Sequence, residues 1–148
     1  MLQRQGWLAG VFAVVIAALL ASTAFAEKTK IKTTKEWKGS VADEKLAKDA
    51  PACITDAKAL EKLWKAWKIE DKMPEVDFTK EIVVLSTTPG SRLTIFANLD
   101  DKGNLEVGGL ATRDFGEGFR YVIATVPREG VKTINGKDLP AEKKDKDK

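Results

Sequence analysis

The segment DAKALEKLWKAWK, residues 56–68, decides the fold of this chain. Its large apolar residues recur at helical spacing and form a single stripe, which comprises Leu60, Leu63, Trp64 and Trp67. Thr55 or Asp56 can cap the first turn, because a short polar side chain accepts hydrogen bonds from the free backbone amides there. We therefore predict an amphipathic helix whose aromatic face belongs to the core. The alternative for the two tryptophans is an exposed platform on which a sugar or a cation stacks.

Segments rich in β-branched and aromatic residues surround this helix. The run EIVVLS at 81–86 is typical of a central strand that is buried on both faces. The segment DDKGN at 100–104 predicts a hairpin turn. Further strands are expected at 36–39, 93–99, 105–107, 119–126 and 131–134, a short helix or loop at 41–48, and a glycine-punctuated loop at 108–118.

The connections between these strands decide how they pair. Most of them have the length of a hairpin loop, and this favours antiparallel neighbours, because parallel strands need longer crossovers. We predict one α+β domain over residues 27–140, in which an antiparallel β-meander of about four or five strands packs against one main amphipathic helix.

Residues 1–26 have the layout of a secretory signal peptide. Arg4 precedes an apolar run from Trp7 to Ala21, and small residues lead to an expected cleavage site between Ala26 and Glu27. The run is shorter than the roughly 20 residues that a spanning helix needs. We therefore predict a periplasmic or secreted protein with bacterial-type export and without stable membrane insertion after cleavage. The alternative is an uncleaved N-terminal anchor.

The charge of the chain is mixed. The net charge is +3, and removal of Arg4 with the signal segment leaves +2. A nucleic-acid-binding protein needs a clear excess of clustered Lys and Arg with interleaved aromatic residues, so we predict no nucleic-acid partner. Residues 141–148 are almost all Lys, Asp and Glu, and such a segment is expected to be a disordered tail.

Two residue types limit the possible chemistry. The chain has no histidine, which excludes Ser-His and Cys-His catalytic pairs and metal sites built on imidazole. We predict no catalytic residue, no metal site and no cofactor. Cys53 is the only cysteine, so an intramolecular disulfide is impossible. We expect a buried, inert thiol, and an intermolecular disulfide is the alternative.

The loop TRDFGEG at 112–118 is the first place to look for a binding site, since it concentrates charged groups beside glycines. Its candidate binding residues are Arg113, Asp114 and Glu117. The alternative is a plain turn in which Arg113 pairs with one of the two acids. Asp77 is a fourth candidate, and its alternative role is to cap the start of the following strand.

Four short segments together resemble the PrcB C-terminal domain family, whose members look like small exported bacterial domains linked by name to a protease complex subunit. They are ITD at 54–56, LEKLW at 60–64, PEVDF at 74–78 and IVV at 82–84. The resemblance covers residues 53–87 and continues loosely to residue 126. GSRLTI at 90–95 stands where the family has a Thr-Gly-Gly-Tyr-like segment, so nothing that depends on that segment carries over.

This resemblance implies an accessory or binding role and contributes no catalytic residue. We therefore predict an exported, non-enzymatic domain that stabilises or associates with another envelope or secreted protein. The alternatives are a small-ligand or carbohydrate-binding domain and a carboxylate-dependent hydrolase.

Overall fold

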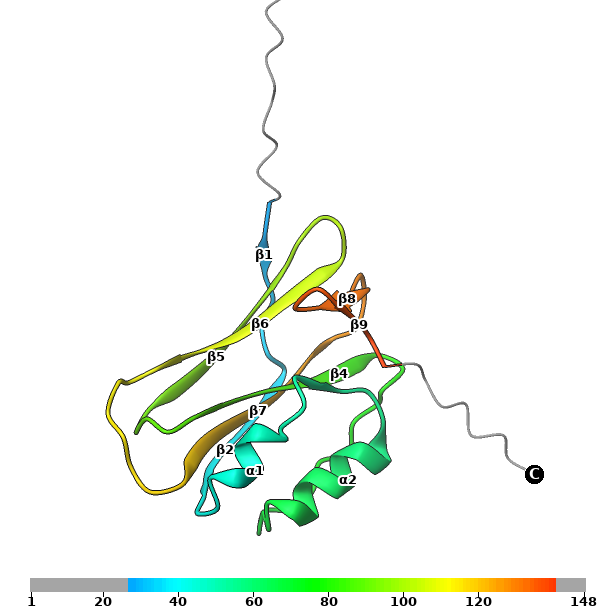
Figure 1. Cartoon of the computed structure of the whole chain (residues 1–148). Helices are drawn as coiled ribbons and strands as arrows, with labels where there is room; N and C mark the ends of the chain where they lie inside the picture. Colours follow the sequence, from blue (N-terminus) through cyan, green and yellow to red (C-terminus); the bar gives the residue numbers. More distant parts are fainter. Residues whose placement is uncertain (1–26, 141–148) are drawn as a thin grey trace, which may run out of the picture.

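Two β-sheets and a helical layer make up residues 27–140, the part of the chain that the computed structural model describes (Figure 1). The inner sheet has the strand order β2-β7-β4-β3 and lies between the helices and the outer sheet, whose order is β1-β5-β6-β8-β9. The predicted signal peptide and charged tail fall at 1–26 and 141–148, which lie outside the described residues. No helix within 27–140 is long and apolar enough to cross a membrane.

The predicted α+β class is confirmed. The inner sheet consists of β2 (Lys35–Val41), β7 (Phe119–Pro127), β4 (Glu81–Thr88) and β3 (Cys53–Ile54). The outer sheet consists of β1 (Thr29–Lys30), β5 (Leu93–Leu99), β6 (Asn104–Ala111), β8 (Thr133–Ile134) and β9 (Lys137–Asp138). All neighbours are antiparallel except β6 and β8, which are parallel.

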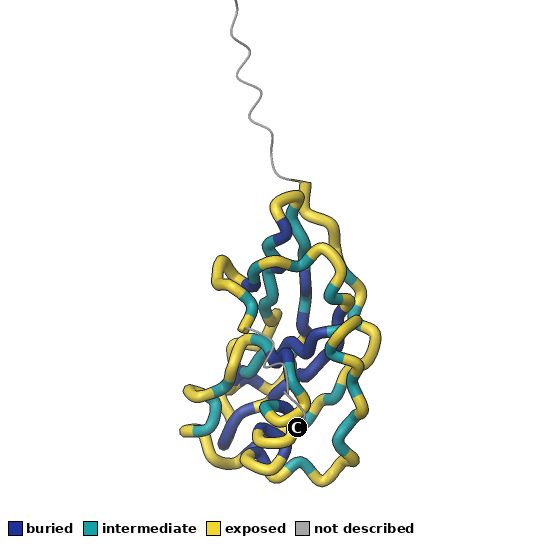
Figure 2. The backbone as a smooth tube through the Cα atoms, turned by 90° about the vertical axis from the view of Figure 1, so that its right-hand side faces the viewer, coloured by how far each residue is buried: buried dark blue, intermediate teal, exposed yellow. Residues whose placement is uncertain are grey.

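Strand β4 explains why the strands divide between two sheets and do not form one continuous meander. Val83 and Leu85 pack in the core beneath the helices, whereas Ile82 and Val84 pack in the core between the sheets. Alternate side chains of a strand point to opposite faces, so this continuous apolar run needs cover on both sides. Figure 2 shows buried residues gathered in the interior of the molecule. The prediction of a strand buried on both faces is confirmed.

The main helix, α2, spans Ala57–Ala66, and capping residues at both ends fix its length. The carboxylate of Asp56 accepts a hydrogen bond from the amide of Ala59 at 2.8 Å. At the other end, Lys68 adopts a positive φ of 51°, and the amide of Ile69 donates to the carbonyl of Trp64. This is the hydrogen bond of a Schellman-type helix end, with lysine where glycine is usual.

The core includes Trp64 of α2 and Trp67, the residue that caps the C-terminal end of this helix. Trp64 and Trp67 are only 6% and 5% exposed. The ring of Trp67 contacts those of Phe119 and Tyr121, with both centroid separations at 5.2 Å. The indole N–H of Trp64 donates to the carbonyl of Asp71 at 2.7 Å. Their burial confirms the core prediction and removes the stacking platform on which the carbohydrate-binding alternative relied.

The remaining expectations have mixed outcomes. A short helix, α1 (Lys45–Lys48), forms within the segment predicted as a short helix or loop. The turn at 100–104 joins β5 to β6 as predicted, and Asp100 caps it by accepting from the amides of Lys102 and Asn104. The expectation of a buried Cys53 is wrong, because this residue lies on the short edge strand β3 and is only half-buried. Its partial burial raises the pKa of the thiol.

Glycines 108 and 109 lie inside β6, so the predicted loop at 108–118 is shorter than expected. The aromatic ring of Phe96 lies so close to Gly108 that a Cβ there would be 2.5 Å from it. These glycines therefore allow side chains to approach the strand, and the loop proper begins at residue 112.

Candidate functional site

The loop at 112–118, which we call the Phe115 loop, is hydrogen-bonded to the turn at 89–92 that joins β4 to β5. The amide of Thr112 donates to the carbonyl of Arg92 at 3.2 Å, and the amide of Arg92 donates to the Thr112 hydroxyl at 3.0 Å. The amide of Gly116 donates to the carbonyl of Pro89 at 3.1 Å. These contacts fix the backbone of the Phe115 loop on the rigid end of the inner sheet.

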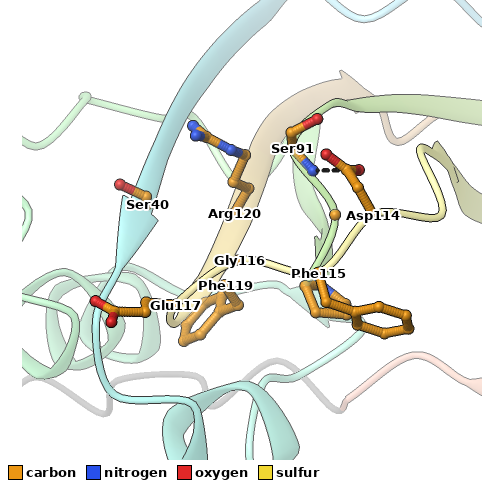
Figure 3. A pocket seen from close by; sticks show the side chains of 10 residues that line it. Ser40, Ser91, Asp114, Phe115, Gly116, Glu117, Phe119 and Arg120 are labelled. Atoms are coloured by element: carbon orange, nitrogen blue, oxygen red, sulfur yellow. Dashed lines mark hydrogen bonds between the residues drawn. The ribbon is translucent and has the colours of Figure 1, made fainter.

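Asp114 contributes a side-chain contact to the same junction. One of its carboxylate oxygens accepts from the amide of Ser91 at 3.0 Å, as the dashed line in Figure 3 marks. Hydrogen bonds from the Ser91 hydroxyl and amide, and then from the Thr112 hydroxyl, lower the pKa of the Asp114 carboxyl. They act because each donor favours the charged form of the acid. Asp114 therefore remains a carboxylate at neutral pH.

Two glycines permit the close approach of the segments at this site. A Cβ on Gly90 would lie 2.3 Å from the carbonyl oxygen of Thr112. Gly118 has a φ of +70°, and a Cβ there would lie 2.0 Å from the carbonyl oxygen of Val41. A larger residue at either position would push the Phe115 loop away from its neighbours.

Phe115 stands out from the loop into solvent. Its side chain is 85% exposed, and the only other large hydrophobic residue that is so exposed within residues 27–140 is Leu110, at 68%. Two hollows adjoin the ring. The first, which we call the loop hollow, measures about 190 Å³ and includes Ser40, Ser91, Asp114, Glu117 and Arg120 in its lining. The second measures about 380 Å³ and includes Ala47, Lys48, Thr88, Pro89 and Phe119.

The loop candidates do not pair with one another in the way that the plain-turn alternative requires. Within residues 27–140, no ion pair joins Arg113 to Asp114 or to Glu117. Asp114 instead accepts a hydrogen bond from the backbone amide of Ser91 in the neighbouring turn. Glu117 lines the loop hollow together with Asp114, whereas Arg113 is exposed outside its lining.

The structure places Asp77 far from the Phe115 loop. Asp77 precedes β4 and the turn at 89–92 follows it, so the eight residues of β4 separate them by about 25 Å at the usual rise of about 3.3 Å per residue. The Asp77 carboxylate accepts from the amide of Thr79 at 3.0 Å, and its carbonyl accepts from the amide of Glu81 at 2.9 Å. These bonds match the capping role. The hollow that Asp114 lines includes neither Asp77 nor Arg113, whereas the hydrolase alternative would require all three residues in one pocket.

A basic hollow lies beside the loop hollow, and no local sequence pattern marks its residues. It measures about 400 Å³, and its polar lining includes Lys38, Ser91, Arg92, Thr94 and Arg120. Figure 3 shows the Arg120 side chain between Ser40 and Ser91. Lys38 and Arg120 sit on two predicted strands that are far apart in the chain, so only the pairing of β2 with β7 brings them together.

The described residues contain no cluster of three or more Cys, Asp and Glu side chains that could hold a metal ion. Comparisons of the chain with protein-family models, with curated proteins and with solved structures found no match. The site therefore has to be interpreted from its own geometry. It combines a fixed loop, an exposed aromatic ring and charged hollows on one side of the molecule, and this combination suits binding.

Proposed function

We propose that the protein is an exported, non-enzymatic binding domain that associates with another envelope or secreted protein through the Phe115 loop. The observation that carries the proposal is the 85% exposure of Phe115 on a loop whose backbone is tied to the inner sheet. Aromatic residues are enriched among the few side chains that supply most of the binding energy at protein interfaces.

The fixed loop favours binding because little conformational entropy remains to be lost there. Ordering a flexible segment on association reduces affinity, and this loop is already ordered by contacts of Thr112, Asp114 and Gly116. Full burial of a Phe side chain contributes about 1.5–3 kcal/mol. Such a contribution corresponds to a change in Kd of roughly 10- to 150-fold.

Export to the cell envelope is the second part of the proposal. The layout of residues 1–26 supports it, and so does the resemblance of residues 53–87 to the PrcB C-terminal domain family, which implies an accessory role. With one cysteine, the fold holds without an internal disulfide, so it depends on its two apolar cores in any redox environment.

A quantitative pull-down from the native envelope fraction tests the proposal. The Phe115→Ser variant should lose the captured partner, because the change removes the aromatic anchor, and the 85% exposure of Phe115 means that little core packing is lost. Leu110→Ser, on the outer sheet, is the matched control and should retain the partner. Equal recovery from both variants, or no specific protein under conditions that capture a known complex, would contradict the proposal. Equal thermal midpoints of the variants verify that both are folded.

A further inference from the structure

Three cationic side chains from three segments line the basic hollow. In the register of the inner sheet, Ser40 lies opposite Arg120 and Lys38 lies opposite Val122. Side chains of directly opposed residues share a face, and alternate residues of one strand share it too. Lys38, Ser40 and Arg120 therefore project from the face on which Val122 packs toward the outer sheet. Arg92 reaches the same hollow from the turn before β5.

The positive charge of this hollow is incompletely balanced within the described part of the chain. No acidic residue belongs to its lining, and Asp114 and Glu117 line the adjoining loop hollow, which shares Arg120 with it. Lys38 forms an ion pair with Glu36 at 3.2 Å, but Arg92 and Arg120 form none within residues 27–140. Like charges brought together in this way repel one another, and a bound anion removes that cost. A guanidinium group matches a carboxylate in particular, since its planar fork donates two parallel hydrogen bonds.

The basic hollow adjoins the Phe115 loop. Ser91 and Arg120 line both the basic hollow and the loop hollow, which Phe115 also lines. One segment of a partner can therefore cover the ring of Phe115 and place acidic side chains over Arg120 and Arg92.

We propose that the basic hollow binds the carboxylates of an acidic segment in the partner protein. This inference rests on the proposed function and adds to it that the contacting segment of the partner is acidic. Arg120 lies at the centre of the contact, and Arg92 and Lys38 flank it.

A titration with a short peptide tests the charge preference without the partner. The probe is an acetylated and amidated Gly-Asp-Glu-Asp-Gly peptide, added to the purified protein while backbone amide signals are followed by NMR. The signals of Ser91, Arg92 and Arg120 should shift, and binding should weaken with salt because the contact is between charges. The matched Gly-Asn-Gln-Asn-Gly peptide should cause no shift.

Two variants distinguish a defined site from a general surface potential. Arg120→Gln should weaken binding of the acidic peptide by about tenfold, which is typical for loss of a hydrogen bond between charged groups. Lys137→Gln removes one positive charge from the exposed strand β9, outside the lining of the hollow, and should weaken peptide binding by less than about twofold, as expected for a screened surface charge. Equal losses in the two variants, or binding of inorganic phosphate as strong as that of the peptide, would overturn the inference.

The pull-down separates failure of this inference from failure of the proposed function. If the Phe115→Ser variant and the Arg120→Gln variant each lose the partner, the result supports the proposed function and the acidic-segment inference. If Phe115→Ser loses the partner and Arg120→Gln keeps it, the proposed function stands and the acidic-segment inference is wrong. If both variants keep the partner, the proposed function itself is wrong.

Discussion

Replacement of Trp67 by alanine should destabilise the protein strongly, because its ring is a central element of the core beneath the inner sheet. Trp67 is 5% exposed and contacts the rings of Phe119 and Tyr121. A core aromatic side chain buries about 150–250 Å², and at about 25 cal/mol per Å² this amounts to roughly 4–6 kcal/mol. Alanine keeps a small part of that burial. We therefore expect the free energy of unfolding to fall by about 4 kcal/mol, in the range typical of Trp→Ala changes in cores.

Urea denaturation followed by far-ultraviolet circular dichroism measures this loss. Trp37→Ala is the matched control, since Trp37 is half-buried at the edge of the same core, with its ring 6.2 Å from that of Trp64. It should lose only about 1–2 kcal/mol, because less apolar area returns to water. A loss below about 1 kcal/mol for Trp67→Ala would refute the reasoning, since removal of a buried aromatic side chain lowers the free energy of unfolding by more than this. It would also restore the interpretation of Trp67 as a ligand platform.

Two further changes test smaller features. Lys68→Gly should raise the free energy of unfolding by up to about 1 kcal/mol, because glycine adopts the positive φ of this helix end without steric cost; an unchanged or lower urea midpoint would contradict this. Asp77→Asn should flatten the acid dependence of stability. Hydrogen bonds from the Thr79 hydroxyl and amide lower the pKa of Asp77 in the folded protein, so the carboxylate stabilises the fold above about pH 4, the ordinary value, and this stabilisation is lost as the pH falls further. Thermal midpoints of the two proteins between about pH 6 and 2 should converge toward acid, and parallel curves would exclude the mechanism.

Periodic apolar patterns made much of the fold predictable. The helical stripe of α2 and the apolar run of β4 are local signals, and both describe burial correctly. The continuous run in β4 also carried the information that both faces are covered. The run did not show that a second sheet covers one of these faces, because the outer sheet forms through contacts between distant segments such as β6 and β8.

The candidate site was predictable only in part, for the same reason. Charged residues beside glycines pointed to the Phe115 loop, where Asp114 and Glu117 do line a hollow. The partner of Asp114 is Ser91, which lies 23 positions away along the chain. Arg120 lies in an otherwise apolar strand, where no sequence pattern marks it, and its place in the basic hollow depends on the register between β2 and β7. Such pairings follow from the tertiary structure and leave no local pattern.

Site-directed photocrosslinking at residue 115 tests the central claim most directly. A photoreactive phenylalanine analogue replaces Phe115 in one protein and Leu110 in a second, and each is irradiated in the native envelope fraction. We predict one specific crosslinked protein from position 115 that is absent from position 110, because only the Phe115 loop faces the partner. Equal crosslinking from both positions, or none from position 115, would contradict the account.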